Sequence, residues 1–175
     1  MELSDGTYHI TARGNRRQLI FGDDGDRRFF LALLARITRE YEWSLHSYCL
    51  LDTHYHLVLE TTRTRLSAGM KRLNGTYAQT FNARHGFVGH LFQGRFYSGL
   101  IEGEGHLLEV IRYVAANPVK AGLCDEASAW QWSSYASLIG QRRREPFVAN
   151  ERVLALFSED PSRARHSIRR FLTDR

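Results

Sequence analysis

The sequence predicts an α+β fold built on a four-stranded antiparallel sheet. Four segments alternate apolar with polar residues, which is the pattern of strands that bury one face. Two longer segments between them carry apolar residues at helical spacing. The resulting order, β-α-β-β-α-β, is that of the ferredoxin-like plan, in which both helices cover the same face of the sheet. A third helix on the open face and a basic C-terminal extension are predicted to follow.

The first strand and the first helix are predicted near the N-terminus. Residues 6–13 alternate in polarity, so that His9 and Thr11 point to the same face of the sheet. The acidic segment 23–26 can cap a helix, because carboxylates accept hydrogen bonds from its free N–H groups. The helix itself is predicted at residues 27–41, with a buried stripe made of Phe30, Leu33, Leu34 and Ile37.

The next two strands are predicted to form a hairpin that carries a pair of histidines. Residues 43–51 and 53–60 both alternate in polarity, and a short turn joins them. On the second strand, His54 and His56 point to the same face. Two imidazoles at this spacing can bind one metal ion, although two polar residues on an exposed sheet face fit the pattern as well. A register centred on the turn places Cys49 opposite His56.

A second helix and a fourth strand complete the sheet. The helix is predicted at residues 65–82 and the strand at residues 92–101. In the ferredoxin-like plan, strands one and three are neighbours at the centre of the sheet. The histidine pair should therefore lie in the middle of the open face, beside His9 or Thr11, where a sheet of this kind can receive a ligand.

The third helix is predicted at residues 103–117, and Pro118 is expected to end it. Its apolar stripe consists of Leu107, Leu108, Ile111, Val114 and Ala115. At about 100° per residue, a polar set gathers on the other side. This set is His106, Glu109, Tyr113 and Asn117. A tyrosine on that side would not pack in the hydrophobic core.

Charge is concentrated in the C-terminal part of the chain. Residues 141–175 carry nine of the 24 basic residues and five acidic residues. Residues 1–140 carry 15 basic and 14 acidic residues. We expect residues 1–140 to form one domain, closed by a packing segment at 130–135. Residues 141–175 are expected to form a helical basic tail, either as a solvated appendage or as a surface for non-specific duplex binding.

Composition excludes several classes of protein. No apolar run approaches the roughly 20 residues of a membrane span, and the acidic N-terminus lacks the apolar segment of a signal peptide. The two cysteines, Cys49 and Cys124, match neither a zinc-ribbon nor a redox spacing. A cytoplasmic, nucleoid-associated protein is therefore the expectation, with no membrane partner.

Several motifs together resemble a known family. His54-Tyr55-His56 on a strand, followed by Tyr113 within residues 112–123, is similar to the single-tyrosine HUH transposases of the IS200-like family, and most of all to the REP-associated tyrosine transposases. Where that family has a hydrophobic middle residue, this chain has Tyr55. The resemblance covers residues 6–140, which we therefore expect to form the catalytic domain. Further similar stretches are residues 13–15, 21–24, 89–95 and 132–135.

The resemblance implies a catalytic site with a nucleophile and a metal ion. Tyr113 takes the place of the nucleophile, and Asn117, one helical turn further on, takes the place of the third metal ligand beside His54 and His56. Mg²⁺ or Mn²⁺ is the expected cofactor. Tyr113 would attack a phosphodiester and form a covalent 5′-phosphotyrosine, which a DNA 3′-OH can reverse to join strands.

The resemblance also implies the substrate, which is single-stranded DNA beside a hairpin in repeated extragenic palindromes. Candidate DNA contacts are Arg16, Arg17, Arg95 and Tyr97, each of which could equally be solvated surface. Three accessory residues are expected near the nucleophile. The metal ion and either Arg112 or Arg95 would supply positive charge, Glu109 could instead accept the proton through water, and His9 would lie beside the histidine pair.

Other readings of the same residues stay open at this point. A domesticated regulator would keep the fold and bind DNA hairpins without cutting them. An initiator or relaxase would use the same chemistry, although such proteins tend to be longer. A zinc hydrolase could use His54 and His56 with Cys49 or His9. The oligomeric state, monomer or homodimer, is not fixed by any pattern in the sequence.

Overall fold

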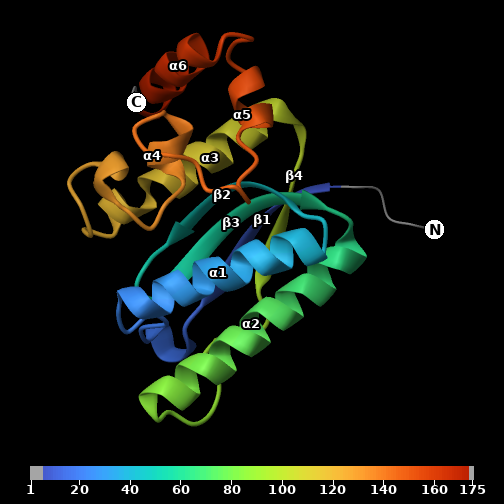
Figure 1. Ribbon diagram of the computed structural model, residues 1–175, viewed down its shortest axis with the longest axis vertical. Coiled ribbons are helices and arrows are strands. Elements are labelled where there is room, and N and C mark those ends of the chain that lie inside the picture. The colour runs from blue at the N-terminus through green and yellow to red at the C-terminus, as the bar shows by residue number, and fades with distance from the viewer. Residues whose placement is uncertain (1–5, 174–175) are drawn as a thin grey trace.

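The computed structural model describes residues 6–173, and its main body is a sheet between layers of helices (Figure 1). The element order of the ferredoxin-like plan is confirmed. The elements are β1 (Gly6–Arg13), α1 (Asp24–Glu40), β2 (Ser44–Leu50), β3 (His54–Thr61), α2 (Arg63–His85), β4 (Tyr97–Ile101) and α3 (Gly103–Lys120).

The four strands form one antiparallel sheet in the order β2-β3-β1-β4. The predicted central position of strands one and three is therefore confirmed. Thr11 of β1 lies opposite His56 of β3, and Cys49 of β2 lies opposite His56 from the other side, as the hairpin register predicted. Residues directly opposite each other share a face, so these three side chains form one row across the sheet.

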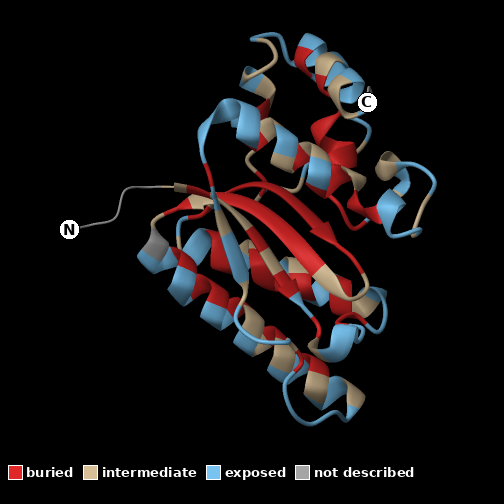
Figure 2. Ribbon diagram, turned by 180° about the vertical axis from the view of Figure 1, so that it is seen from behind, coloured by how far each residue is buried: buried red, intermediate tan, exposed pale blue. Residues whose placement is uncertain are grey.

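Each face of the sheet has its own hydrophobic layer. Helices α1 and α2 cover one face, and the cluster there contains Phe30 of α1, Tyr55 of β3 and Tyr77 of α2, all almost fully buried. Tyr55 fits this core because its hydroxyl donates to Asn74 Oδ1 at 2.5 Å. Helix α3 covers part of the other face through Ile111 and neighbouring apolar residues. Figure 2 shows the sheet from behind, with β2 and β3 buried over most of their length.

Two element boundaries at the first helix and the fourth strand differ from the prediction. Helix α1 begins at Asp24 rather than at residue 27, because the Asp23 carboxylate caps it by accepting from the Asp26 N–H at 3.0 Å. Strand β4 begins only at Tyr97. The preceding residues pair instead with the turn after β1, since Gln93 N donates to Arg13 O at 2.9 Å.

The second and third helices are longer than predicted. Helix α2 extends to His85, and Thr62 caps its start by accepting from Arg65 N. Helix α3 runs through Pro118 to Lys120. Proline removes only one helical hydrogen bond, and the next turn is closed by Ala121 N donating to Asn117 O at 2.9 Å.

The chain after α3 packs against the edge of the sheet and against α3. A 3-10 turn, η2 (Ala127–Ala129), and helix α4 (Tyr135–Leu138) flank a segment that pairs antiparallel with β2. In that segment Leu50 N donates to Trp132 O at 2.8 Å and Ser134 N donates to Tyr48 O at 3.0 Å. This is the closing role predicted for residues 130–135.

The basic C-terminal segment folds into two further helices, α5 (Glu151–Ala155) and α6 (Pro161–Thr173). Val153 of α5 and Ile168 of α6 are buried in the same cluster as Ile111 of α3. Within residues 6–173, no helix combines the length and the apolar character that crossing a membrane requires.

A buried carboxylate joins the start of α1 to the end of α2. Asp26 accepts from Gly22 N at 2.7 Å and from Arg84, and it lies 2.8 Å from His85 Nε2. Burial raises the pKa of Asp26, but these hydrogen bonds outweigh burial, and the net shift is downward. A lowered folded-state pKa adds stability above the unfolded-state value, and this stability is lost as pH falls through the folded-state value.

We therefore expect Asp26→Ala to lower the free energy of unfolding by about 1–3 kcal/mol near neutral pH. The loss should shrink as pH falls below the ordinary aspartate range, because the wild-type carboxylate is then protonated. Urea unfolding at a series of pH values measures the loss of stability and its dependence on pH. Asp24→Ala is the control, since that carboxylate is half exposed, and it should cost less than about 1 kcal/mol. An Asp26→Ala loss that does not change with pH would contradict this expectation.

Candidate active site

The two histidines of β3 lie side by side on the face that α3 partly covers. Their ring centroids are 5.1 Å apart, and the His56 side chain is buried, with 2% of its surface exposed. His54 lies opposite Arg13 on β1, and His56 lies opposite Thr11. The predicted common orientation of the pair is confirmed by the strand register.

A hydrogen-bond network on β1 fixes one nitrogen of His56. His56 Nδ1 lies 3.0 Å from Thr11 Oγ1 and 3.0 Å from His9 Nε2. The opposite nitrogen, His56 Nε2, is buried and has no hydrogen-bond partner among the described residues. With its proton on Nδ1, which can donate to Thr11 Oγ1 or His9 Nε2, the His56 imidazole would keep a lone pair on Nε2 for a ligand. His54 has a similar arrangement, with Nδ1 3.1 Å from Thr53 Oγ1.

Burial keeps both imidazoles neutral. Burial, and then the nearby Arg13, lowers the pKa of His54 to about 4. Burial, followed by the charges of His54 and His9, lowers the pKa of His56 to about 3. Burial also lowers the pKa of His9. Neutral imidazole is the form that binds a metal ion, so both β3 histidines are in that form near neutral pH.

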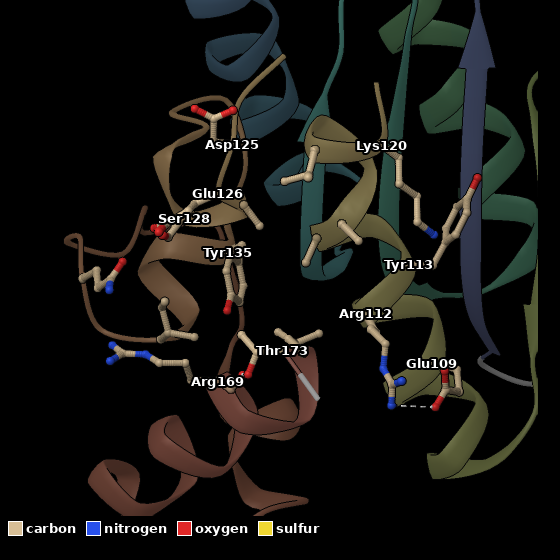
Figure 3. Close-up of a pocket in the computed structure, with 17 residues that line it drawn as sticks. Glu109, Arg112, Tyr113, Lys120, Asp125, Glu126, Ser128, Tyr135, Arg169 and Thr173 are labelled. Atoms are coloured by element: carbon tan, nitrogen blue, oxygen red, sulfur yellow. Dashed lines mark hydrogen bonds and ion pairs between the residues drawn. The ribbon is translucent and has the colours of Figure 1, made fainter. Parts of the chain in front are cut away.

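Tyr113 of α3 reaches the histidines from the covering helix. Its ring centroid lies 5.5 Å from that of His56 and 5.8 Å from that of His9, both in edge-to-face geometry. Tyr113 is 45% exposed, although its ring contacts two buried or half-buried imidazoles. Lys120, two turns further along α3, places its Nζ 5.4 Å from the centre of the Tyr113 ring (Figure 3).

Asn117 lies one turn after Tyr113 on the same helix and is buried. Its amide nitrogen, Nδ2, donates to the Tyr113 carbonyl at 2.8 Å. The amide oxygen, Oδ1, makes no hydrogen bond to the described residues and is available as an acceptor. The sequence predicted Asn117 at the end of the helix, whereas the structure holds it inside α3, where its side chain is rigidly placed.

The residues present can supply ligands to a divalent cation. The donor set offers two neutral imidazoles, one with a buried nitrogen that has no partner, and one amide oxygen. Among residues 6–173, no three His, Cys, Asp or Glu side chains converge as a metal site. Burial raises the pKa of Cys49 to about 12, so its thiol is protonated near neutral pH when no metal ion is bound.

The two accessory residues on α3 face another part of the molecule. Arg112 forms an ion pair with Glu109 at 3.2 Å, and its guanidinium stacks 4.0 Å from the centre of the Phe171 ring on α6. Both line a cavity of about 780 Å³ between α3, η2 and α6, and Tyr113 stands at the edge of this cavity (Figure 3). The cation in contact with the Tyr113 ring is Lys120, which the sequence analysis did not single out.

Comparison with known proteins decides the family. The model of the family described as "Transposase IS200 like" matches residues 2–117, which is well over half of the chain. The chain belongs to the IS200-like transposase family. The resemblance found in the sequence is thereby confirmed, and with it a role in DNA transposition. A comparison with curated protein sequences gave no match.

Solved structures of similar fold include other transposases. One is described as a REP-associated tyrosine transposase bound to a REP hairpin. It is 19% identical, with a TM-score of 0.67, and the match covers 84% of this chain and 86% of that one. Another is described as a putative transposase from Deinococcus radiodurans R1, at 16% identity and a TM-score of 0.47, covering 66% of this chain and 92% of that one. The first likeness supports the fold of this IS200-like transposase.

The four candidate DNA contacts of the transposase fall into two places. Tyr97 of β4 lies opposite Thr11, in the row that contains His56, and is 64% exposed. Arg16 and Arg17 lie in the 3-10 turn η1 (Asn15–Arg17) beyond the end of β1, and both are exposed. Arg95 is also exposed and precedes β4. Only Tyr97 is therefore in the same row as the histidine site.

The backbone of Arg16 and Arg17 is strained. Their φ angles are +53° and +58°, in the left-handed region that disfavours side chains with a Cβ. Neither guanidinium has a hydrogen bond or an ion pair to any residue that the structure describes. Residues with strain of this kind cluster at functional sites, so the turn is a reasonable place to look for a DNA contact.

We expect Arg16→Gly and Arg17→Gly each to raise the free energy of unfolding by about 0.5–1 kcal/mol, because glycine adopts a positive φ without strain. Chemical denaturation measures the change. The control is Arg28→Gly on the exposed side of α1, where the same replacement should lower stability by about 1 kcal/mol. A loss of stability at all three positions would show that the turn is not strained.

Proposed function

We propose that the protein nicks single-stranded DNA beside a hairpin and rejoins strands through a covalent 5′-phosphotyrosine, in a metal-dependent reaction at repeated palindromes. One observation carries the proposal. The ring of Tyr113 lies 5.5 Å from that of His56, whose buried Nε2 has no partner in the described part of the chain. A nucleophile and a ligand site of this kind can act on the same phosphodiester. The hairpin bound to the solved relative supports the choice of substrate.

The chemistry of the tyrosine follows from its position. The Tyr113 oxygen attacks phosphorus, forms a new P–O bond and loses its proton to solvent, while the bond to the 3′ oxygen breaks and that oxygen takes up a proton. The phosphodiester energy is kept in the phosphotyrosine. A DNA 3′-OH can therefore attack it, release Tyr113 and join two strands without ATP.

The other residues hold the reacting groups in place. His54, His56 and the Asn117 amide oxygen would hold Mg²⁺ or Mn²⁺, which when bound polarises a non-bridging phosphate oxygen. Imidazole ligands favour Mn²⁺ in vitro, whereas Mg²⁺ is abundant in cells. Lys120 places its Nζ 5.4 Å from the centre of the Tyr113 ring and would supply positive charge beside that ring.

We expect Tyr113→Phe to abolish nicking of hairpin DNA and to leave DNA binding within about twofold, because only the hydroxyl is removed. The matched control is Tyr97→Phe, which removes the hydroxyl of the other exposed tyrosine on this face. A denaturing gel of protein incubated with labelled hairpin DNA and Mn²⁺ detects the covalent product. Nicking by Tyr113→Phe at the wild-type rate would place the nucleophile elsewhere. Binding without any covalent product in wild type would favour a non-cleaving regulator.

Metal dependence is tested separately. EDTA should stop cleavage and added Mn²⁺ should restore it. His56→Ala should weaken Mn²⁺ binding by at least about 100-fold, because it removes one of the two imidazole ligands. Titration followed by electron paramagnetic resonance measures the affinity without any cleavage assay. His166→Ala on the exposed side of α6 is the control and should bind Mn²⁺ as wild type does. Equal affinity of the two variants would rule out this ligand set.

A further inference from the structure

A pocket rich in arginine lies between the segment that follows α4 and the start of α6. Its volume is about 570 Å³. We call it the arginine pocket. Its lining contains one acidic side chain, Glu151, and four arginines, which are Arg142, Arg143, Arg144 and Arg165. All of its lining residues lie outside residues 2–117, the part of the chain that the family model matches.

Two of the four guanidinium groups have partners and two do not. Arg142 donates to two backbone carbonyls, at 2.7 and 2.6 Å, and pairs with Glu145 at 3.3 Å. Arg144 pairs with the one glutamate of the lining. Arg143 and Arg165 are exposed, and neither guanidinium has a hydrogen bond or an ion pair with any residue from 6 to 173. The pocket therefore carries uncompensated positive charge, which favours an anionic ligand.

The side chain of Arg165 lies against a glycine. Gly140 has a φ of +77°, a conformation that residues with a Cβ rarely adopt. A Cβ at this position would lie 2.9 Å from Arg165 Cδ, which is closer than carbon atoms pack. Glycine therefore lets the arginine approach the backbone and holds it at the pocket. A side chain that is already held in place loses less conformational entropy when it binds a ligand.

A buried amide in the lining of the arginine pocket also has no partner. Asn150 is 4% exposed, and its side chain makes no hydrogen bond to any residue that the structure describes. Buried polar side chains are nearly always hydrogen-bonded, so an unpartnered one is a sign of a missing ligand or water. The amide carries two N–H donors beside its oxygen, and asparagine is a common donor to phosphate oxygens.

Helix α6 joins the arginine pocket to the cavity beside Tyr113. Arg165 lines the pocket, and Arg169, one helical turn further on, lines the cavity of about 780 Å³ that has Tyr113 at its edge. Gln141 lines both. Figure 3 shows Arg169 on α6 and Arg112 on α3 at this cavity. Positive side chains therefore follow α6 from the arginine pocket toward the proposed nucleophile.

We propose that the arginine pocket binds a backbone phosphate of the DNA substrate, in a place separate from the histidine site. Arginine forks match the oxygens of a phosphate group, and such a contact positions DNA without reading its bases. The inference goes beyond the proposed function, because it concerns DNA binding and not the chemistry of Tyr113. Free inorganic phosphate has the same oxygens, so the experiment has to separate the two sources.

The salt dependence of DNA affinity tests the inference, because each phosphate contact releases bound counterions. The protein carries Tyr113→Phe so that no cleavage occurs, and the probe is hairpin DNA with single-stranded flanks. Arg143→Gln together with Arg165→Gln should remove one phosphate contact. The slope of log Kd against log salt concentration should fall by about 0.7–0.9, and affinity near physiological salt should fall about tenfold. Arg165→Lys alone keeps the charge and should keep most of the slope.

The matched control removes two arginines from the other side of the molecule. Arg28 and Arg36 are exposed on α1, which covers the opposite face of the sheet (Figure 1). Arg28→Gln together with Arg36→Gln lowers the net charge by the same amount and should leave the slope unchanged. Both double variants should melt within about 2 °C of the parent protein, because they replace exposed side chains.

Melting curves in inorganic phosphate and in sodium chloride of equal ionic strength show whether the free anion binds. A melting temperature raised by phosphate, with DNA binding unaffected by the pocket substitutions, would assign the pocket to a free anion and overturn the inference. Equal slopes for the pocket variant and the parent, or equal losses in the pocket and α1 variants, would also overturn it. Failure of the parent protein to bind hairpin DNA at all would contradict the proposed function as well.

Discussion

The pairing of β1 with β3 is the constraint on which the site depends. It puts Thr11 and His9 beside His56 Nδ1, and this leaves Nε2 as the ring nitrogen that has no partner among the described residues. A slip of one residue would turn every side chain of the strand to the other face and would bury the imidazoles among the core residues of α1 and α2. Burial of these side chains also keeps the imidazoles neutral. The same contacts therefore determine both the orientation and the protonation state of the histidines.

The position of Tyr113 depends on residues outside the family match. Helix α3 packs on the sheet through Ile111, and on its far side it is held by Ile168 and by Phe171, which stacks on Arg112. These contacts come from α6, beyond residues 2–117. The C-terminal segment therefore supports the catalytic helix in addition to carrying positive charge. Removal of α6 would change the packing of α3 and thereby the position of Tyr113.

The sequence was sufficient for the order of the strands, the hairpin register and the meeting of Tyr113 with the histidines, because these follow from periodicity and from one resemblance. It failed where contacts between segments that are far apart in the sequence determine the local structure. Strand β4 starts late because residues 91–93 pair with the end of β1, and α3 passes through Pro118 because both of its sides are packed. Lys120 was missed because a helix ending at residue 117 would not have carried it to the Tyr113 ring.

Mapping the covalent product by mass spectrometry tests the central claim most directly. Protein incubated with hairpin DNA and Mn²⁺ is digested, and the DNA-modified peptide is sequenced. The account predicts one modified side chain, Tyr113, since its ring alone among the tyrosines contacts the His56 imidazole in the described part of the chain. Modification of any other residue, or cleaved DNA with no modified peptide, would contradict the account.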